Sequence, residues 1–107
     1  MISDENSYII EDLKNTVRAI FDHINTYFQC QREGDARGCK MLTQSLGEAY
    51  EYLVINFNVR TMAEAEELLS NLENNNNGNF QARLNSGAQL EGNPTDHLES
   101  ILAFSRP

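Results

Sequence analysis

Apolar residues recur at steps of three and four positions over the first third of the chain. This spacing predicts a long amphipathic helix over residues 5–33, capped at its start by Ser3 or Asp4. The apolar face is too broad for the interface of a two-stranded coiled coil. We therefore expect it to contact two neighbouring helices, or one helix and a second copy of the chain. The stripe consists of Ile10, Leu13, Val17, Ile20, Ile24 and Tyr27, widened by Phe21 and Phe28.

A second apolar stripe predicts a helix over residues 36–56. The end of this segment is ambiguous, because alternate residues from Leu53 to Val59 are apolar, as in a β-strand. No other segment alternates as well, and a strand without a partner is unstable, so we keep the interpretation of a helix that ends near residue 56. The stripe consists of Cys39, Leu42, Leu46, Ala49 and Leu53, with Tyr50 and Phe57 beside it.

The sequence TMAE marks the start of a third helix, predicted over residues 61–74. Thr61 and Glu64 have the spacing of a capping box, in which each side chain accepts a hydrogen bond from the backbone N–H of the other residue. The apolar face that follows consists of Met62, Ala65, Leu68, Leu69 and Leu72.

A polar stretch separates these helices from the end of the chain. Residues 76–93 are rich in Asn, Gly, Ser and Gln, which is typical of a linker or a loosely held loop. Its apolar anchors are Phe80, Leu84 and Leu90. We predict an all-α protein in which three main helices form an antiparallel bundle. Its helical core domain covers residues 1–75, and a docking helix after the linker lies within residues 94–107.

That short C-terminal helix is predicted over residues 94–104, with Asn93 or Thr95 as its cap and Pro94 in its first turn. A free helix of about eleven residues is marginal in water, so this one must dock on something. It either folds back as the fourth helix of its own bundle, or inserts its apolar face into a groove on a partner or a second copy. The face consists of Leu98, Ile101, Leu102 and Phe104.

The net charge of −8 is concentrated in two of the predicted helices. Residues 1–33 carry six acids against three bases, and residues 61–79 carry four acids and no base. Such a surface repels nucleic acid and anionic lipid, and it accelerates association with basic partners. We therefore expect no direct binding to nucleic acid or to a membrane, and we expect contact with a basic protein partner through Glu64, Glu66, Glu67 and Glu73.

The segment CQREGDARGC contains both cysteines of the chain. Gly34 and Asp35 have the order of a left-handed helix C-cap followed by an N-cap, so they predict a turn between two helices. Cys39 lies on the buried stripe of its helix, whereas Cys30 lies about 120° from the centre of its own stripe. A disulfide would therefore require the helices to twist, and reduced cysteines are expected.

Other chemical sites are disfavoured. The two histidines and two cysteines include no closely spaced pair of the CxxC or HxxxH type, so zinc is not expected. Glu33 and Asp35 would repel a phosphate at the turn. His23 and His97 lie in no catalytic motif, and neighbouring acids diverge on the helix surface. We expect no enzyme activity, no metal and no cofactor.

The order of a long helix, a GD turn, a second helix with YEYL and a third with AEELLSNL resembles flagellin export chaperones. Members of that family are helical bundles that wrap a disordered client. The resemblance covers the middle third of the chain and rests on residues that are common in helices. The start of the chain lacks the family's pattern, so the resemblance assigns no site residues.

These observations predict a small acidic helical protein that binds another protein stoichiometrically, as an adaptor, inhibitor or chaperone of a bacterium or phage. Its partner would present a basic surface, such as one that normally holds nucleic acid. The alternative is a structural protein that self-associates, for example as a homodimer. The start MISDENSYIIEDL has acids where a signal peptide needs positive charge, so a cytoplasmic location is expected, in a bacterial cell or in the host of a phage. The predicted partner-binding residues are Leu98, Ile101, Leu102, Phe104, Glu64, Glu66, Glu67 and Glu73.

Overall fold

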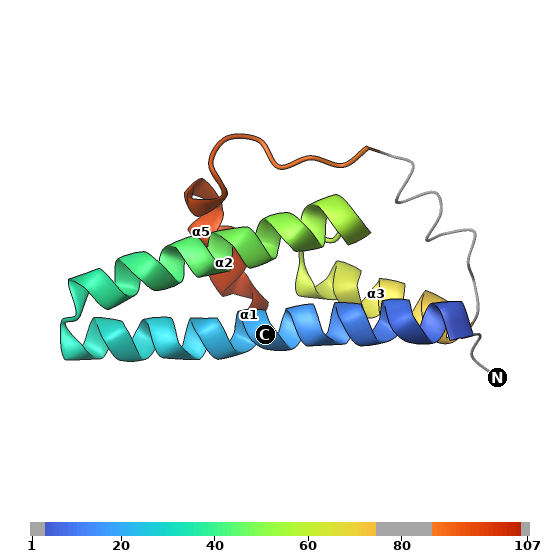
Figure 1. The fold of residues 1–107 in the computed structure, drawn as a ribbon, viewed down its shortest axis with the longest axis horizontal. Coiled ribbons are helices and arrows are strands. Elements are labelled where there is room, and N and C mark those ends of the chain that lie inside the picture. Colours follow the sequence, from blue (N-terminus) through green and yellow to red (C-terminus); the bar gives the residue numbers. More distant parts are fainter. Residues whose placement is uncertain (1–3, 75–86, 106–107) are drawn as a thin grey trace.

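The protein is an all-α bundle of three main helices and a short C-terminal helix, as predicted (Figure 1). The computed structural model describes residues 4–74 and 87–105. The main helices are α1 (Asp4–Glu33), α2 (Ala36–Phe57) and α3 (Met62–Glu73). The C-terminal segment consists of a 3₁₀ helix η1 (Pro94–His97), the helix α5 (Leu98–Leu102) and a second 3₁₀ helix η2 (Ala103–Ser105).

The long helix α1 forms the base on which the other elements assemble. Both α2 and α3 run antiparallel to α1, and α3 lies beside its N-terminal half (Figure 1). The molecule is elongated along α1, with extents of 47 × 27 × 22 Å. Two helices and the end of the C-terminal segment therefore share the apolar face of α1.

The predicted stripe of α1 is buried along its whole length, from Ile10 to Tyr27. The helices α2 and α3 and the turn η2 all contact α1. Of the two arrangements considered for this broad face, the structure has the first, in which neighbours from the same chain cover it. Burial of each such side chain contributes about 1.5–3 kcal/mol, so this face is a main source of the bundle's stability.

The turn between α1 and α2 has the predicted caps. Gly34 has a φ of +72°, a left-handed conformation that suits glycine and ends α1. The Asp35 side chain then accepts a hydrogen bond from the Gly38 N–H at 2.9 Å, which caps α2. A glycine and an aspartate side by side thus reverse the chain without an intervening loop.

The segment that resembled a strand is helical as far as Phe57, which confirms the interpretation from the sequence. The helix α2 continues to Phe57 and ends at Asn58, which has a φ of 52° and donates its backbone N–H to the Val54 carbonyl. Asparagine tolerates this left-handed conformation better than most residues. Val59 follows it into the core and is fully buried.

The start of α3 differs in one detail from the predicted capping box. The Thr61 hydroxyl accepts a hydrogen bond from the Glu64 N–H at 3.1 Å, as expected. The Glu64 carboxylate, however, accepts its bond from the N–H of Arg60, not from that of Thr61. The prediction was wrong by one residue, because the extended backbone at Thr61 brings the preceding N–H within reach of the carboxylate.

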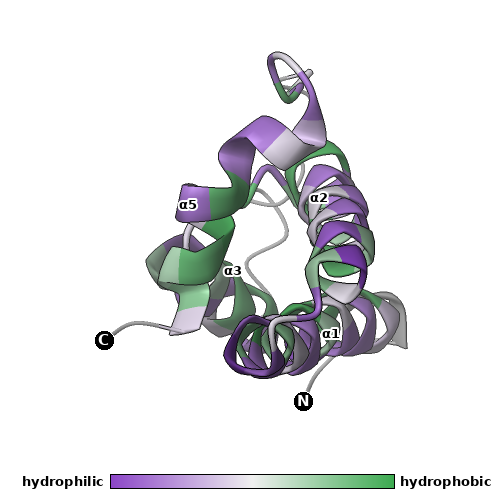
Figure 2. Ribbon diagram, turned by 90° about the vertical axis from the view of Figure 1, so that its left-hand side faces the viewer, coloured by the Kyte–Doolittle hydropathy of each residue, from purple (hydrophilic) through white to green (hydrophobic). Residues whose placement is uncertain are grey.

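The C-terminal helix is shorter and less regular than predicted. Only Leu98–Leu102 is α-helical, and 3₁₀ turns precede and follow it. The segment begins against α2 and ends against α1, so it crosses from one helix to the other (Figure 2).

Candidate interaction surfaces

The apolar face of the C-terminal segment is docked on its own bundle. Ile101 is fully buried, Leu102 and Phe104 are more than nine-tenths buried, and Leu98 is half-buried against the same core. These four residues were predicted to bind a partner. In this conformation their side chains face the interior, which matches the alternative in which the segment folds back as part of the bundle.

Tyr50 of α2 joins three parts of the chain at this dock. Its hydroxyl donates a hydrogen bond to the Arg60 carbonyl at 3.0 Å, which ties α2 to the turn before α3. Its ring packs edge-on against Phe104 and tilted against His97, each at a centroid distance of 6.1 Å. Burial raises the pKa of the Tyr50 hydroxyl, so the proton needed for that bond is retained.

The C-terminal segment approaches α2 closely at Gly47. A Cβ atom placed on Gly47 would lie 2.9 Å from Pro94 Cβ, 3.1 Å from the Pro94 carbonyl carbon and 3.2 Å from the Thr95 nitrogen. These atoms belong to a proline ring and to the backbone, so they cannot move aside easily. The sequence signal was available, because a glycine within a helix usually has a packing reason, but Gly47 was not singled out.

The segment before η1 is also held by polar contacts. The Arg60 guanidinium donates a hydrogen bond to the Gln89 carbonyl at 3.0 Å, and the His97 ring nitrogen Nε2 lies 2.7 Å from the Glu91 carbonyl oxygen. Leu90 is half-buried against the core, as expected of an anchor. The other two predicted anchors, Phe80 and Leu84, lie outside the described residues.

The outward face of α3 is acidic. Glu66, Glu67 and Glu73 are exposed, whereas Glu64 is half-buried and accepts the N–H of Arg60. Glu66 and Glu73 are seven residues apart, so they project from the same stripe about 10 Å apart along the helix axis. The helix contains no Lys or Arg, and its surface therefore has a single sign of charge.

A row of exposed apolar side chains follows the outward face of α2. Met41, Tyr52 and Ile55 are 63%, 42% and 51% exposed. Their spacing of eleven and three residues places them on one stripe of a helix. Tyr52 also donates a hydrogen bond to the Asp12 carboxylate at 2.7 Å, which links α2 to α1, and this bond raises the pKa of the Tyr52 hydroxyl. We name Met41, Tyr52 and Ile55 the outer α2 row.

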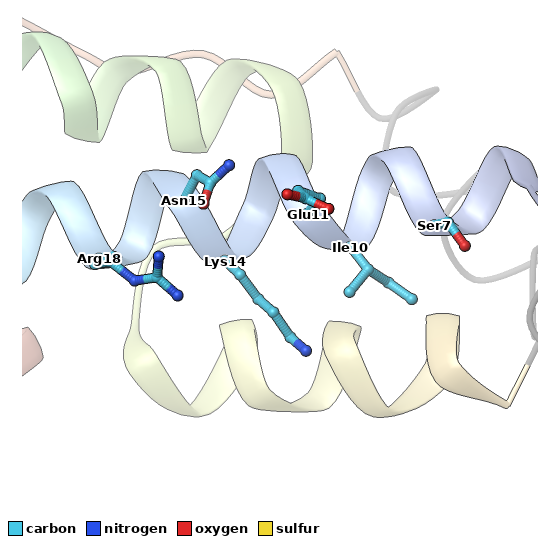
Figure 3. Close-up of a pocket in the computed structure, with 6 residues that line it drawn as sticks. All are labelled: Ser7, Ile10, Glu11, Lys14, Asn15 and Arg18. Carbon is cyan, nitrogen blue, oxygen red and sulfur yellow. The ribbon is translucent and has the colours of Figure 1, made fainter.

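A shallow hollow of about 390 Å³ lies along α1 on the side of α3. Ile10 and Lys14 extend from α1 toward α3 (Figure 3). Lys14 and Arg18 add two positive charges one helical turn apart, close to the acidic helix α3. The lining residues are Ser7, Ile10, Glu11, Lys14, Asn15 and Arg18.

Within residues 4–74 and 87–105, no three His, Cys, Asp or Glu side chains are grouped so that they could hold a metal ion. No described helix is both long enough and apolar enough to span a membrane. Comparison of the chain with protein-family models, with curated proteins and with solved structures found no match.

Proposed function

We propose that this protein binds a protein partner stoichiometrically through the acidic face of α3, and that the partner presents a basic surface. The observation that carries this proposal is the arrangement of exposed acids on α3. Glu66 and Glu73 share one outward stripe, Glu67 lies beside it, and the helix has no basic residue. A single-signed surface of this kind attracts the opposite charge and repels nucleic acid.

The scaffold beneath this face supports the proposal. Ala65, Leu68 and Leu72 of α3 are fully buried, so the helix is fixed by its opposite side while its acids point outward. A rigid helix loses little conformational entropy when a partner binds to its surface. A fitting partner is a protein with clustered Lys and Arg residues, such as a nucleic-acid-binding protein. This acidic helical protein would act on that partner as an adaptor, an inhibitor or a chaperone.

In this proposal the C-terminal segment stabilises the bundle and does not contact the partner. Ile101 and Phe104 are buried in the core, so we propose that the partner binds α3 while the segment stays docked. Glu64 contributes mainly by capping α3 through the Arg60 N–H. Direct contact of Leu98, Ile101, Leu102 and Phe104 with a partner would require the segment to leave the bundle.

The test replaces the three exposed acids of α3 with amides, in the variant E66Q/E67Q/E73Q. Partners are captured from extracts of the native source, and the affinity of the captured protein is measured by calorimetry at low and high salt. We expect a one-to-one complex whose Kd rises about tenfold or more in the variant, because an exposed charge pair contributes about 0.5–1 kcal/mol. Higher salt should weaken the wild-type complex more than the variant complex.

The matched control is D22N/E48Q/E99Q, which removes the same number of charges from exposed positions on α1, α2 and α5. A general effect of net charge would weaken binding equally in both variants, and the proposal would then be wrong. An interface on α3 requires the control to retain nearly the wild-type affinity. Circular dichroism of all three proteins shows whether the bundle is unchanged.

Self-association is the second candidate, and the outer α2 row is the observation that favours it. Three large apolar side chains are exposed on one side of α2, and a second copy of the chain could cover them. We expect a dimer by sedimentation that the variant M41K/I55K converts to a monomer with an unchanged melting temperature. A wild-type protein that is monomeric at all concentrations would contradict this candidate.

A further inference from the structure

Both cysteines of the chain lie at the turn between α1 and α2. Cys30 is in the last turns of α1, Cys39 is in the first turns of α2, and both are free thiols that are half-buried. They line the same hollow of about 330 Å³, together with Gln31, Gly34, Asp35 and Ala36. A small reagent that enters this hollow would meet both sulfur atoms.

The backbone of both cysteines is hydrogen-bonded to the backbone of Asp35 in the turn. The Asp35 N–H donates a hydrogen bond to the Cys30 carbonyl at 2.9 Å, and the Cys39 N–H donates one to the Asp35 carbonyl at 3.0 Å. The two side chains also line one hollow, and Cys39 is among the neighbouring groups that raise the pKa of the Cys30 thiol. Cys39 Sγ lies 3.9 Å from the Tyr27 carbonyl oxygen, which keeps this sulfur on the side of α1.

Gly38 leaves room for the groups around this turn. A Cβ atom on Gly38 would lie closest to the Asp35 carboxylate oxygen Oδ2, 2.8 Å from the Asp35 carboxyl carbon and 3.0 Å from Cys30 Sγ. The Cys30 sulfur therefore lies against the first turn of α2, the turn that also contains Cys39. A side chain at position 38 would crowd both this sulfur and the Asp35 cap. Helical phase alone had indicated that the two cysteines diverge, but both line the same hollow.

We propose that Cys30 and Cys39 form a reversible dithiol switch, which small-molecule disulfides oxidise to an intramolecular disulfide that clamps α1 to α2. The Cys39 thiolate attacks one sulfur of the small disulfide, whose S–S bond breaks, and the released half leaves as a thiol with the proton that Cys39 lost. Cys30 then loses its proton and attacks the Cys39 sulfur of the mixed disulfide. The second half leaves as a thiol, so one small disulfide is reduced to two thiols.

The surroundings of the two thiols set the order of these steps. Burial raises the pKa of the Cys30 thiol, and the nearby charges of Asp35 and Glu33 raise it further. Little of Cys30 is therefore present as the thiolate that would attack a disulfide in solution, so Cys30 takes the second step. It becomes effective in the second step, because the mixed disulfide on Cys39 is then held beside it.

The experiment treats the purified full chain with millimolar oxidised glutathione and follows the reaction by mass spectrometry. We expect a monomer that has lost two hydrogens, whose digestion yields a cross-linked peptide containing Cys30 and Cys39. The melting temperature should rise by about 5–15 °C, because a short disulfide-closed loop restricts the unfolded chain, and dithiothreitol should reverse the rise.

Single variants test the assignment of the two roles. In Cys30→Ser the reaction should stop at a glutathione adduct on Cys39, and in Cys39→Ser the adduct on Cys30 should form several-fold more slowly. Three results would overturn the proposal in the wild-type chain: two thiols that remain free to alkylation, adducts that persist on both cysteines, or a disulfide that joins two chains. These outcomes are read on the wild-type protein, so they do not depend on whether a variant folds.

Discussion

A chain that ends at Asn93 is expected to lose about 4 kcal/mol or more of its free energy of unfolding, and its melting temperature to fall by about 16 °C or more. The deletion removes Ile101, Leu102 and Phe104, which are buried in the same core as the main helices. Truncation of one such side chain to alanine typically costs about 2–5 kcal/mol. The deletion also uncovers Tyr50, whose ring packs on Phe104 and His97. Thermal and urea unfolding followed by circular dichroism measure the loss.

A chain that ends at Ser105 is the control, because it keeps the whole of η1, α5 and η2. It should melt within a few degrees of the full chain. A truncation at Asn93 that left the melting curve unchanged would contradict the docked arrangement. If the same truncation also abolished partner binding, the segment would be a tethered binding helix, the alternative that the sequence left open.

The main helices could be predicted because their signals are local. The apolar stripe of α1 from Ile10 to Tyr27 requires only the period of the helix, and the turn at Gly34 and Asp35 requires only the preferences of two residues for their caps. The helical interpretation of residues 52–59 rested on the lack of a partner strand. Asn58, which ends α2 in a left-handed conformation, is the local signal that would have supported it directly.

The docking of the C-terminal segment could not be predicted, because its cause is not local. The pattern of Leu98, Ile101 and Leu102 is the same whether the chain itself or a partner covers it. What decides between them is the close approach at Gly47 and the ring of Tyr50, both about fifty residues away in sequence. The length of the α-helix was also overestimated, since 3₁₀ turns precede and follow Leu98–Leu102.

Of the candidate surfaces, one could be predicted from the local sequence and the others could not. The exposure of Glu66, Glu67 and Glu73 follows from helical phase, so the sequence located the acidic face of α3 correctly. The outer α2 row was not predicted, because an exposed Tyr52 or Ile55 can be recognised only when the covered faces of α2 are known. The hollow that Cys30 and Cys39 share was missed for a similar reason, since it depends on how the ends of α1 and α2 meet at the turn.

Gly47→Leu is expected to lower the free energy of unfolding by about 2–4 kcal/mol, although leucine is the better helix former by almost 1 kcal/mol. Its Cβ alone would approach the Pro94 carbonyl carbon and the Thr95 nitrogen to 3.1 and 3.2 Å, which is closer than side chains normally come. The rest of the leucine side chain must therefore displace η1 from α2. Gly47→Ala should have a smaller effect, about 0–2 kcal/mol, because its gain in helix propensity offsets part of the overlap.

Lys40→Leu is the matched control, since it places the same side chain at an exposed position of α2 outside the hollow that Pro94 and Thr95 line, and it should change the stability by no more than about 0.5 kcal/mol. The cause of the Gly47→Leu effect is isolated by making the same change in the chain that ends at Asn93. There Pro94 is absent, so the substitution should have no cost or should stabilise what remains of the bundle. An equal loss of unfolding free energy in both chains would mean that leucine disturbs α2 itself. Contact between Gly47 and the C-terminal segment would then not be the cause of the effect.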